Sequence, residues 1–229
     1  MNFVKLSILS LFSGLIIPFI MIQGYYYRII GKQIETFIND DYPTPSFSDF
    51  KKLLLDGLKI IISNIYNIPV ILLTIVAYHQ MIKFEGSLIY IDITSEALII
   101  FILFIVALVT FVFSKIAVAN MVKHGTLKSL FSFKEIFSVI KNIGFFNCFK
   151  FFIYYEVILA VITLGIFLLI LFVGSIFFFN YIPIDLYFIT LSLDTVIFLF
   201  VYILIIYPFI IFFEGRAIGS LYTLGEEED

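Results

Sequence analysis

The chain has 229 residues, of which 62% are hydrophobic and only 14% are charged, with a formal net charge of −3. A soluble domain averages about 25% charged residues and could not bury this much Phe, Ile and Leu, so the composition excludes an ordinary soluble domain and favours a protein of the lipid bilayer. The single cysteine, Cys148, excludes an internal disulfide, a CxxC redox pair and a multi-cysteine metal site.

Five apolar stretches predict membrane-spanning helices. Each holds about 20 residues, the helical length that crosses about 30 Å of hydrocarbon, and none shows the alternation of a barrel strand. The stretches cover residues 6–26, 60–78, 97–119, 151–172 and 195–213. The first ends in three tyrosines instead of a small-residue cleavage site, so we interpret it as a retained span. We expect an all-α integral membrane protein with a single domain of residues 1–229.

An amphipathic helix is predicted at residues 46–59, before the second span. Pro43 and Pro45 interrupt the chain before it, and Ser46 followed by Asp49 resembles a capping box. At helical spacing one face carries the apolar residues Phe47, Phe50, Leu54, Leu58 and Ile61, and the other carries the charged residues Asp49, Lys51, Lys52, Asp56 and Lys59. This pattern is typical of a helix that lies in the membrane interface.

A second amphipathic helix is predicted at residues 132–147. Ser132 and Glu135 form a Ser-x-x-Glu capping box. Its apolar face is predicted to hold Phe133, Phe137, Ile140 and Gly144, and its polar face Lys134, Ser138 and Lys141. Residues 130–136 resemble residues 47–53 at an offset of 83 residues, which indicates either a parallel internal repeat or a coincidence in a sequence of low variety.

The basic residues predict the orientation of the chain. Twelve of the fourteen Lys and Arg residues fall in the first connection, the third connection and the C-terminal tail, which an alternating five-span arrangement places on one side. Lys and Arg concentrate on the cytoplasmic side, so we expect a protein of the cell membrane with its N-terminus outside and its C-terminus inside. The acidic stretch at 225–229 is expected to be a solvated tail.

Four polar residues near or within the spans form a candidate intramembrane site: Asn64, Asn67, Glu156 and Asp194. Glu156 either marks a proton or ion pathway, or reaches the interface or pairs with a lysine such as Lys115. The two asparagines either form part of that pathway or bond between packed helices. Asp194 also suits the first turn of a helix, where an acidic group is favoured.

No enzymatic motif accompanies these residues. The sequence lacks HExxH, GxSxG, Walker A and dinucleotide-binding signatures, and His79 and His124 have no acidic or cysteine partner at ligand spacing. We therefore expect no catalytic residue, no metal and no cofactor.

Several short motifs together resemble a known family. They are Gly24-Tyr25-Tyr-Tyr-Arg28, Pro45-x-Phe47-x-Asp49, Leu55-Asp56-Gly57-Leu58-Lys59, Tyr66-x-x-Pro69 and Phe213-Glu-Gly215-Arg216. They resemble an uncharacterised membrane family, a domain of unknown function that is common in methanogenic and halophilic archaea and occurs in bacteria. The resemblance implies a multi-pass membrane protein and supplies no activity.

Two functions remain open at this point. The first is a non-enzymatic protein that organises or scaffolds the cytoplasmic leaflet, with the bilayer and its anionic lipids as partners of the amphipathic helices. The alternative is a small transporter or channel subunit that uses Glu156 with Asn64 and Asn67. Other membrane proteins or a second copy of the chain are further expected partners, and nucleic acid is not.

Overall fold

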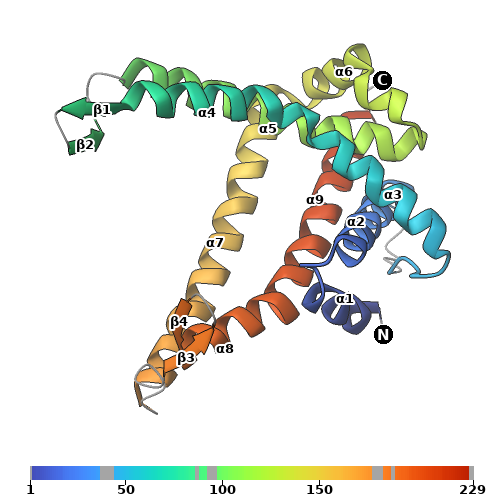
Figure 1. Ribbon diagram of the computed structural model, residues 1–229. Helices are drawn as coiled ribbons and strands as arrows, with labels where there is room; N and C mark the ends of the chain where they lie inside the picture. The colour runs from blue at the N-terminus through green and yellow to red at the C-terminus, as the bar shows by residue number, and fades with distance from the viewer. Residues whose placement is uncertain are drawn as a thin grey trace.

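The computed structural model describes residues 2–36, 44–85, 88–91, 97–176, 183–186 and 189–226. The chain is an all-α protein with two short β-hairpins at helix ends, β1–β2 and β3–β4 (Figure 1). The α-helices are α1 (Asn2–Leu11), α2 (Ile16–Thr36), α3 (Phe50–Ser63), α4 (Ile68–Met81), α5 (Ala97–His124), α6 (Phe133–Ile143), α7 (Phe145–Ile176), α8 (Leu193–Val201) and α9 (Tyr207–Glu226). The shorter elements are η1 (Asn64–Asn67), η2 (Leu127–Phe131), the π-helical η4 (Tyr202–Ile206), β1 (Ile82–Glu85), β2 (Leu88–Ile91), β3 (Pro183–Leu186) and β4 (Ile189–Ser192).

The molecule divides into a compact hub and two arms. We define the hub as residues 2–36, 44–63, 112–145 and 207–226, and it contains most of the buried apolar side chains. The first arm consists of η1, α4, the β1–β2 hairpin and α5 up to residue 111; the second consists of α7 from residue 146, the β3–β4 hairpin, α8 and η4. The arms leave the hub in different directions (Figure 1).

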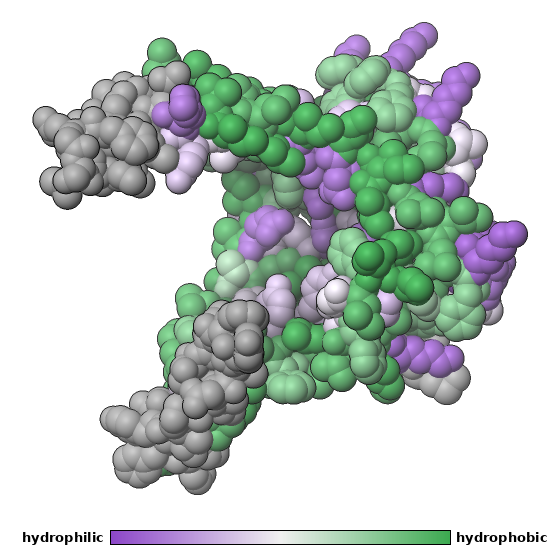
Figure 2. Space-filling view, viewed as in Figure 1, coloured by the Kyte–Doolittle hydropathy of each residue, from purple (hydrophilic) through white to green (hydrophobic). Residues whose placement is uncertain are grey.

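Four helices among the described residues are long and apolar enough to cross a membrane, namely Phe50–His79, Leu98–His124, Phe145–Ile176 and Leu193–Glu226. Apolar residues cover the arms, whereas hydrophilic residues gather on the hub (Figure 2). These helices contain the predicted spans at 60–78, 151–172 and 195–213, and all but the first residue of the span at 97–119. The helix Leu193–Glu226 is continuous through the π-helical η4. This π turn precedes Pro208 and accommodates the proline within the long apolar helix.

The predicted first span at 6–26 differs from the structure, because the helix is broken at residues 12–15. Pro18 lies in the first turn of α2, and its ring opposes helix in the preceding turn. Ser13 and Gly14 occupy the break and are weak helix formers. The result is a helical hairpin of α1 and α2 instead of one continuous span.

The amphipathic helices also differ from the sequence-based bounds. The first helix begins at Phe50 rather than Ser46, and it runs through η1 into α4. Asp49, not Ser46, is its N-cap. The second is α6, which ends at Ile143 and is followed by the C-cap residue Gly144 with φ 86°. Its N-cap residue, Ser132, makes no side-chain cap bond. The order of amphipathic helix, long helix, hairpin and long helix occurs twice, although the internal repeat itself stays a prediction.

Two helical faces were assigned incompletely from the sequence. The apolar faces that begin with Phe50 and Phe133 are exposed, although Phe133 and Phe137 also contact Phe113 of α5. A second face of α3 and of α6 is buried within the hub. On α3 this buried face carries Leu53, Asp56, Gly57 and Ile60, and on α6 it carries Ile136, Val139 and Ile140. Asp56 therefore faces the protein, where a solvent-facing position was expected. The start of the acidic tail, Gly225 and Glu226, belongs to α9, and residues 227–229 lie outside the described residues.

Candidate functional site

The centre of the hub is the crossing of α2 and α3, where two glycines allow backbone contact. A Cβ on Gly24 would lie 1.9 Å from the carbonyl oxygen of Leu53, and one on Gly57 would lie 1.9 Å from that of Ile20. No side chain fits at either position, since the helices touch through main-chain atoms. The crossing brings together two motifs that lie some thirty residues apart in the chain, and it places Arg28 beside Asp56.

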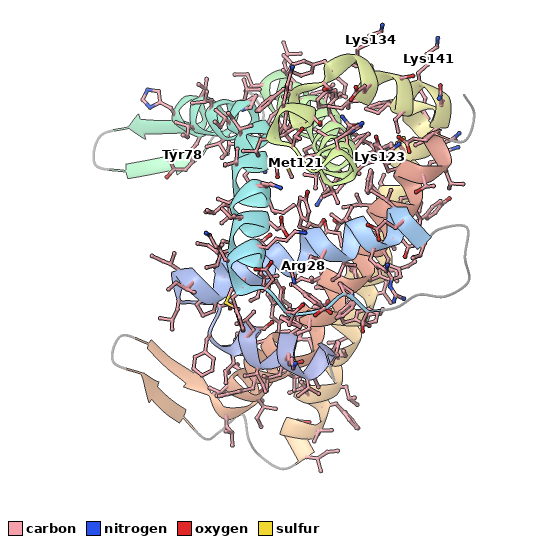
Figure 3. The ribbon with its side chains drawn as sticks, turned by 90° about the vertical axis from the view of Figure 1, so that its right-hand side faces the viewer. Arg28, Tyr78, Met121, Lys123, Lys134 and Lys141 are labelled. Atoms are coloured by element: carbon pink, nitrogen blue, oxygen red, sulfur yellow. The ribbon has the colours of Figure 1, made fainter. Side chains whose placement is uncertain are left out.

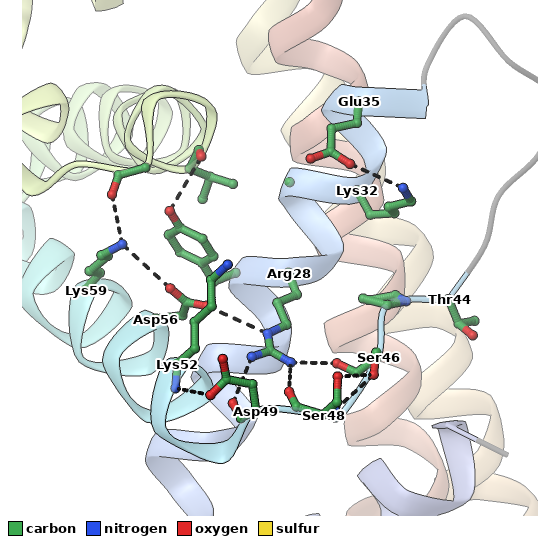
Figure 4. A pocket seen from close by; sticks show the side chains of 15 residues that line it. Arg28, Lys32, Glu35, Thr44, Ser46, Ser48, Asp49, Lys52, Asp56 and Lys59 are labelled. Atoms are coloured by element: carbon green, nitrogen blue, oxygen red, sulfur yellow. Dashed lines mark hydrogen bonds and ion pairs between the residues drawn. The ribbon is translucent and has the colours of Figure 1, made fainter.

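Arg28 holds the segment that precedes α3. Its Nη1 donates to the carbonyl oxygens of Ser46 at 2.7 Å and Ser48 at 2.6 Å, and its Nη2 donates to that of Asp49 at 3.1 Å (Figure 4). A planar guanidinium can bind several acceptors at once, which a lysine could not reproduce. The Arg28 side chain thus holds the non-helical residues 46–49 against α2, directly before the first residue of α3.

Asp56 is the acidic centre of the same cluster and is only 3% exposed. Its carboxylate oxygens lie 3.7 Å from Arg28 Nε and 3.6 Å from Lys59 Nζ. Lys59 also donates to the carbonyl oxygen of Gly125 at 2.9 Å, so it joins α3 to the turn after α5. A buried carboxylate is tolerated only when paired, and two cations pair this one.

Two tyrosines of α2 complete the packing. Tyr27 donates to the carbonyl oxygen of Val122 at 3.5 Å, and Lys59 Nζ lies 5.0 Å from the centre of its ring. Burial, with the charge of Asp56, raises the pKa of Tyr27 to about 12, so its hydroxyl is a donor at neutral pH. Tyr25 stacks on Phe47 at a centroid distance of 4.0 Å, so Phe47 faces α2 where the sequence placed it on the membrane-facing side.

Asp49 closes the site at the start of α3. It adopts the left-handed backbone conformation with φ 60°, and its carboxylate accepts from the amide of Lys52 at 3.1 Å. Aspartate is among the residues that tolerate this conformation and cap helices well. The cap fixes the position of Lys52 at the rim of the site.

These residues surround a cavity of about 810 Å³ (Figure 4). Its wall has four cationic side chains, Arg28, Lys32, Lys52 and Lys59, and three acidic ones, Glu35, Asp49 and Asp56. Asp56 forms ion pairs with Arg28 and Lys59, and Glu35 forms an exposed ion pair with Lys32. The Lys52 ammonium has no ion pair among the described residues. The cavity is polar, open and positive by one charge, which suits an anionic group such as a phosphate.

A second polar network holds the C-terminal ends of α5 and α9 together. The buried side chain of Asn120 donates to the Ser129 carbonyl at 2.8 Å and to Glu135 at 3.0 Å, and it accepts from the hydroxyl of Tyr222 at 2.6 Å. Lys123 pairs with Glu226 beside it. Glu135 thus bonds Asn120 and does not complete the predicted capping box. This network was not predicted from the sequence. Its one indication in the sequence is Asn120, a single polar residue within an apolar stretch.

The four residues of the predicted intramembrane site lie in separate places. Asn64 and Asn67 are on η1, are exposed, and bond each other at 3.3 Å. Asp194 is buried at the start of α8, where its carboxylate accepts from the amide of Thr195 and its Cβ abuts Gly174. Glu156 lies on α7, and its charged neighbours are Glu214 and Lys115. The structure therefore does not bring the asparagines to Glu156.

The remaining motif residues have structural positions. Gly215 and Gly219 let α9 approach α2, because a Cβ on either would lie 2.7 Å from a side-chain atom of Ile29 or Gln33. Arg216 and Tyr25 interact electrostatically across the same contact. Pro69 is the second residue of α4 and follows the 3₁₀ segment η1, where the helical hydrogen-bond pattern already changes.

The histidines are not brought together with other ligands. The Nδ1 atom of His124 lies 3.0 Å from the carbonyl oxygen of Asn120, and His79 is in the last turn of α4. Among the described residues no group of three or more His, Cys, Asp and Glu side chains could hold a metal ion.

Comparison with known proteins finds a family and nothing closer. No curated protein and no solved structure matches the chain. A family model described as "Protein of unknown function (DUF4013)" matches residues 8–178, which include the α2–α3 crossing and the whole of the Arg28 cluster. Gly215 and Arg216 lie beyond the match. With three quarters of its length matched, and four helices fit to cross a bilayer, the chain is a membrane protein that belongs to the DUF4013 family.

Proposed function

We propose that this protein is a non-enzymatic component of the cell membrane that organises the cytoplasmic leaflet by binding anionic lipid headgroups at its hub. The observation that carries the proposal is the cationic cavity beside the exposed apolar face of α3. Lipid molecules offer both a phosphate for the first surface and acyl chains for the second.

The arrangement of α3 supports this function. Phe50, Leu55, Leu58 and Ile62 are exposed on its outer side, whereas Lys52 and Lys59 line the cavity on another side. Lysines at the edge of an apolar surface can meet headgroups while the surface contacts acyl chains. The helix α6 shares the exposed apolar side chains, Phe133 and Phe137, but its lysines Lys134 and Lys141 project outward and do not line this cavity (Figure 3).

The hairpin of α1 and α2 supplies a further membrane contact. The exposed residues at its turn include Leu11, Phe12, Leu15 and Ile16. Three of the turn's four amides bond within it, from Phe12 to Leu9, Ser13 to Ser10 and Leu15 to Phe12, at 2.9–3.1 Å. A turn that needs no water for these donors can enter the acyl region, where unsatisfied amides are costly. It would act as a wedge in one leaflet.

The topology that we propose follows from four spans. The basic residues of the hub support a cytoplasmic position for it and for the C-terminus. The outside position of the N-terminus expected from five spans depended on the first stretch, which is broken at residues 12–15. Four spans place α1 and α2 on the side of α9's C-terminal end, and so place both termini in the cytoplasm.

Lipid counting in nanodiscs tests the function. The protein would be reconstituted in zwitterionic lipid, titrated with phosphatidylglycerol, and ejected into a native mass spectrometer that counts retained lipids. The variant K32E/K52E reverses two charges in the cavity, and the control K134E/K141E makes the same change on α6. We expect the cavity variant to lose anionic lipid affinity by about tenfold or more, because each lysine near a membrane surface contributes about 1 kcal/mol.

The control decides between a built site and general attraction. A loss confined to K32E/K52E supports the cavity as the headgroup site. Equal losses in both variants, or equal retention of phosphatidylglycerol and phosphatidylcholine by the wild type, would contradict the proposal.

A further inference from the structure

Three charged side chains lie at similar distances from the hub ends of three of the four long apolar helices. Lys115 is nine residues from the end of α5 at His124, Glu156 is eleven from the start of α7, and Glu214 is twelve from the end of α9. At a rise of about 1.5 Å per residue these distances are about 14–18 Å from helix ends that meet in the hub. That is about half of a ~30 Å hydrocarbon layer, where charged groups are rare and functional.

The charges do not balance. Lys115 on α5 forms an ion pair with Glu214 on α9, and both side chains are partly buried. Glu156 on α7 is exposed on the surface that we assign to the bilayer, and the charges that act on it are those of Glu214 and Lys115. The single ammonium can neutralise only one of the two carboxylates at a time. An ionised carboxylate without a counter-charge is strongly disfavoured in an apolar medium.

Two tyrosine hydroxyls complete the surroundings. Tyr26 of α2 donates a hydrogen bond to Glu214, which leaves that carboxylate well supplied with partners. Tyr155 is 5% exposed, its ring stacks on Phe213 at 5.4 Å, and its hydroxyl has no hydrogen-bond partner among the described residues. The charges that act on this hydroxyl are those of Glu214 and Glu156. A buried hydroxyl without a partner can donate a hydrogen bond to a carboxylate or accept one from a protonated carboxyl.

We propose that Glu156 is the proton-binding residue of an intramembrane site formed with Lys115, Glu214 and Tyr155. A proton from water forms an O–H bond on the carboxylate of Glu156 and removes the one uncompensated charge; its release restores the carboxylate, and no other bond is made or broken. The titratable groups that interact electrostatically with the site or with Glu214 are Lys115 from α5, Tyr26 from α2, Tyr155 from α7, and Tyr207 from α9. Because the Lys115–Glu214 pair is already formed, the proton resides on Glu156.

Infrared spectroscopy of the reconstituted protein tests the site, because a protonated carboxyl has a C=O band that a carboxylate lacks. Spectra of the full-length chain in nanodiscs would be recorded from about pH 4 to pH 9, which spans the ordinary range of glutamate. The wild type should keep a protonated-carboxyl band at neutral pH. Glu156→Gln should abolish it, whereas Asp194→Asn, which removes a buried carboxyl at the far end of the second arm, should leave it.

Two further variants separate proton binding from loss of structure. Glu156→Asp should retain a band at a shifted frequency, and Tyr155→Phe should move the frequency by removing the neighbouring hydroxyl. Gel filtration and thermal unfolding of each variant check that the fold is kept. A wild type without the band at neutral pH, or a band that survives Glu156→Gln, overturns the proposal, as does a band that disappears in Asp194→Asn alone.

Discussion

The hub and the arms are stabilised in different ways, and α5, which passes through both, shows how. Its arm portion exposes Leu98, Phe101 and Phe104, which are 58–70% accessible and can be covered only by lipid or by another protein. Its hub portion buries Ile116, Ala117 and Ala119 completely. Both portions contain many apolar residues. Small residues and polar bonds mark where helix meets helix, and large side chains mark where helix meets acyl chain.

The glycines provide the strongest test of this comparison. Gly57→Leu should abolish the folded protein, because its Cβ alone would lie 1.9 Å from the Ile20 carbonyl and the crossing of α2 and α3 would have to open. Gly165→Leu is the matched change in the second arm, where nothing lies within 4 Å. We expect its gel-filtration profile in detergent to equal that of the wild type. Equal behaviour of the two variants would break the distinction between hub and arm.

The buried carboxylate of the hub should give the next largest effect. Asp56→Ala leaves Arg28 and Lys59 without their common partner and should destabilise the protein by about 3–5 kcal/mol. Glu35→Ala removes a carboxylate from the rim of the same cavity, where the pair with Lys32 is exposed, and should cost less than about 1 kcal/mol. Unfolding in detergent with increasing denaturant measures both. A small effect of Asp56→Ala would mean that the cluster does not hold α3 on α2.

A charge in the arm tests the lipid-facing assignment directly. Leu168 is an exposed residue of α7, and Leu168→Asp should disfavour membrane insertion of this helix by about 3 kcal/mol. Leu168→Met should insert as well as the wild type. Glycosylation mapping of the β3–β4 hairpin in microsomes reports the inserted fraction. Full insertion of the aspartate variant would show that this face is not in hydrocarbon.

The smallest predicted effect concerns alkaline pH. The pKa of Tyr27 is raised from about 10 to about 12, so the folded state holds the phenolic proton more tightly than the unfolded state. Its stabilisation is complete below about pH 10 and is lost as the pH rises towards 12. Tyr27→Phe should therefore have a shallower fall in the free energy of unfolding over this interval. Superimposable pH curves for the two proteins would contradict the burial of this hydroxyl.

Much of the fold could be predicted from the sequence, because helix length and apolar content fix what can cross a bilayer. The helical class and four of the spans follow from these properties alone. The first stretch is equally apolar, but Ser13, Gly14 and Pro18 break its backbone, and hydropathy does not register such a break. Helical spacing predicted the exposed apolar face of α3. It could not predict the burial of Asp56, because that depends on Arg28, which lies on another helix.

The candidate site was visible only as motifs. Gly24, Arg28, Asp56 and Gly57 were singled out as family residues with no reason for their grouping, and the crossing of α2 and α3 supplies that reason. The Asn120 network could not have been predicted, because its partners Ser129, Glu135 and Tyr222 converge only in three dimensions. Pairings between segments far apart in sequence are set by packing, and one sequence does not reveal them.

The central claim is that the arms lie in lipid while the outer side of the hub lies at the water interface. Spin labels at Leu164 and Leu168 on the second arm and at Lys134 and Lys141 on α6, in a Cys148→Ala background, test it by collision with oxygen and with a water-soluble nickel chelate. The arm labels should collide with oxygen and be protected from the chelate, and the α6 labels should show the reverse. Equal access of the chelate to all four positions would contradict the account.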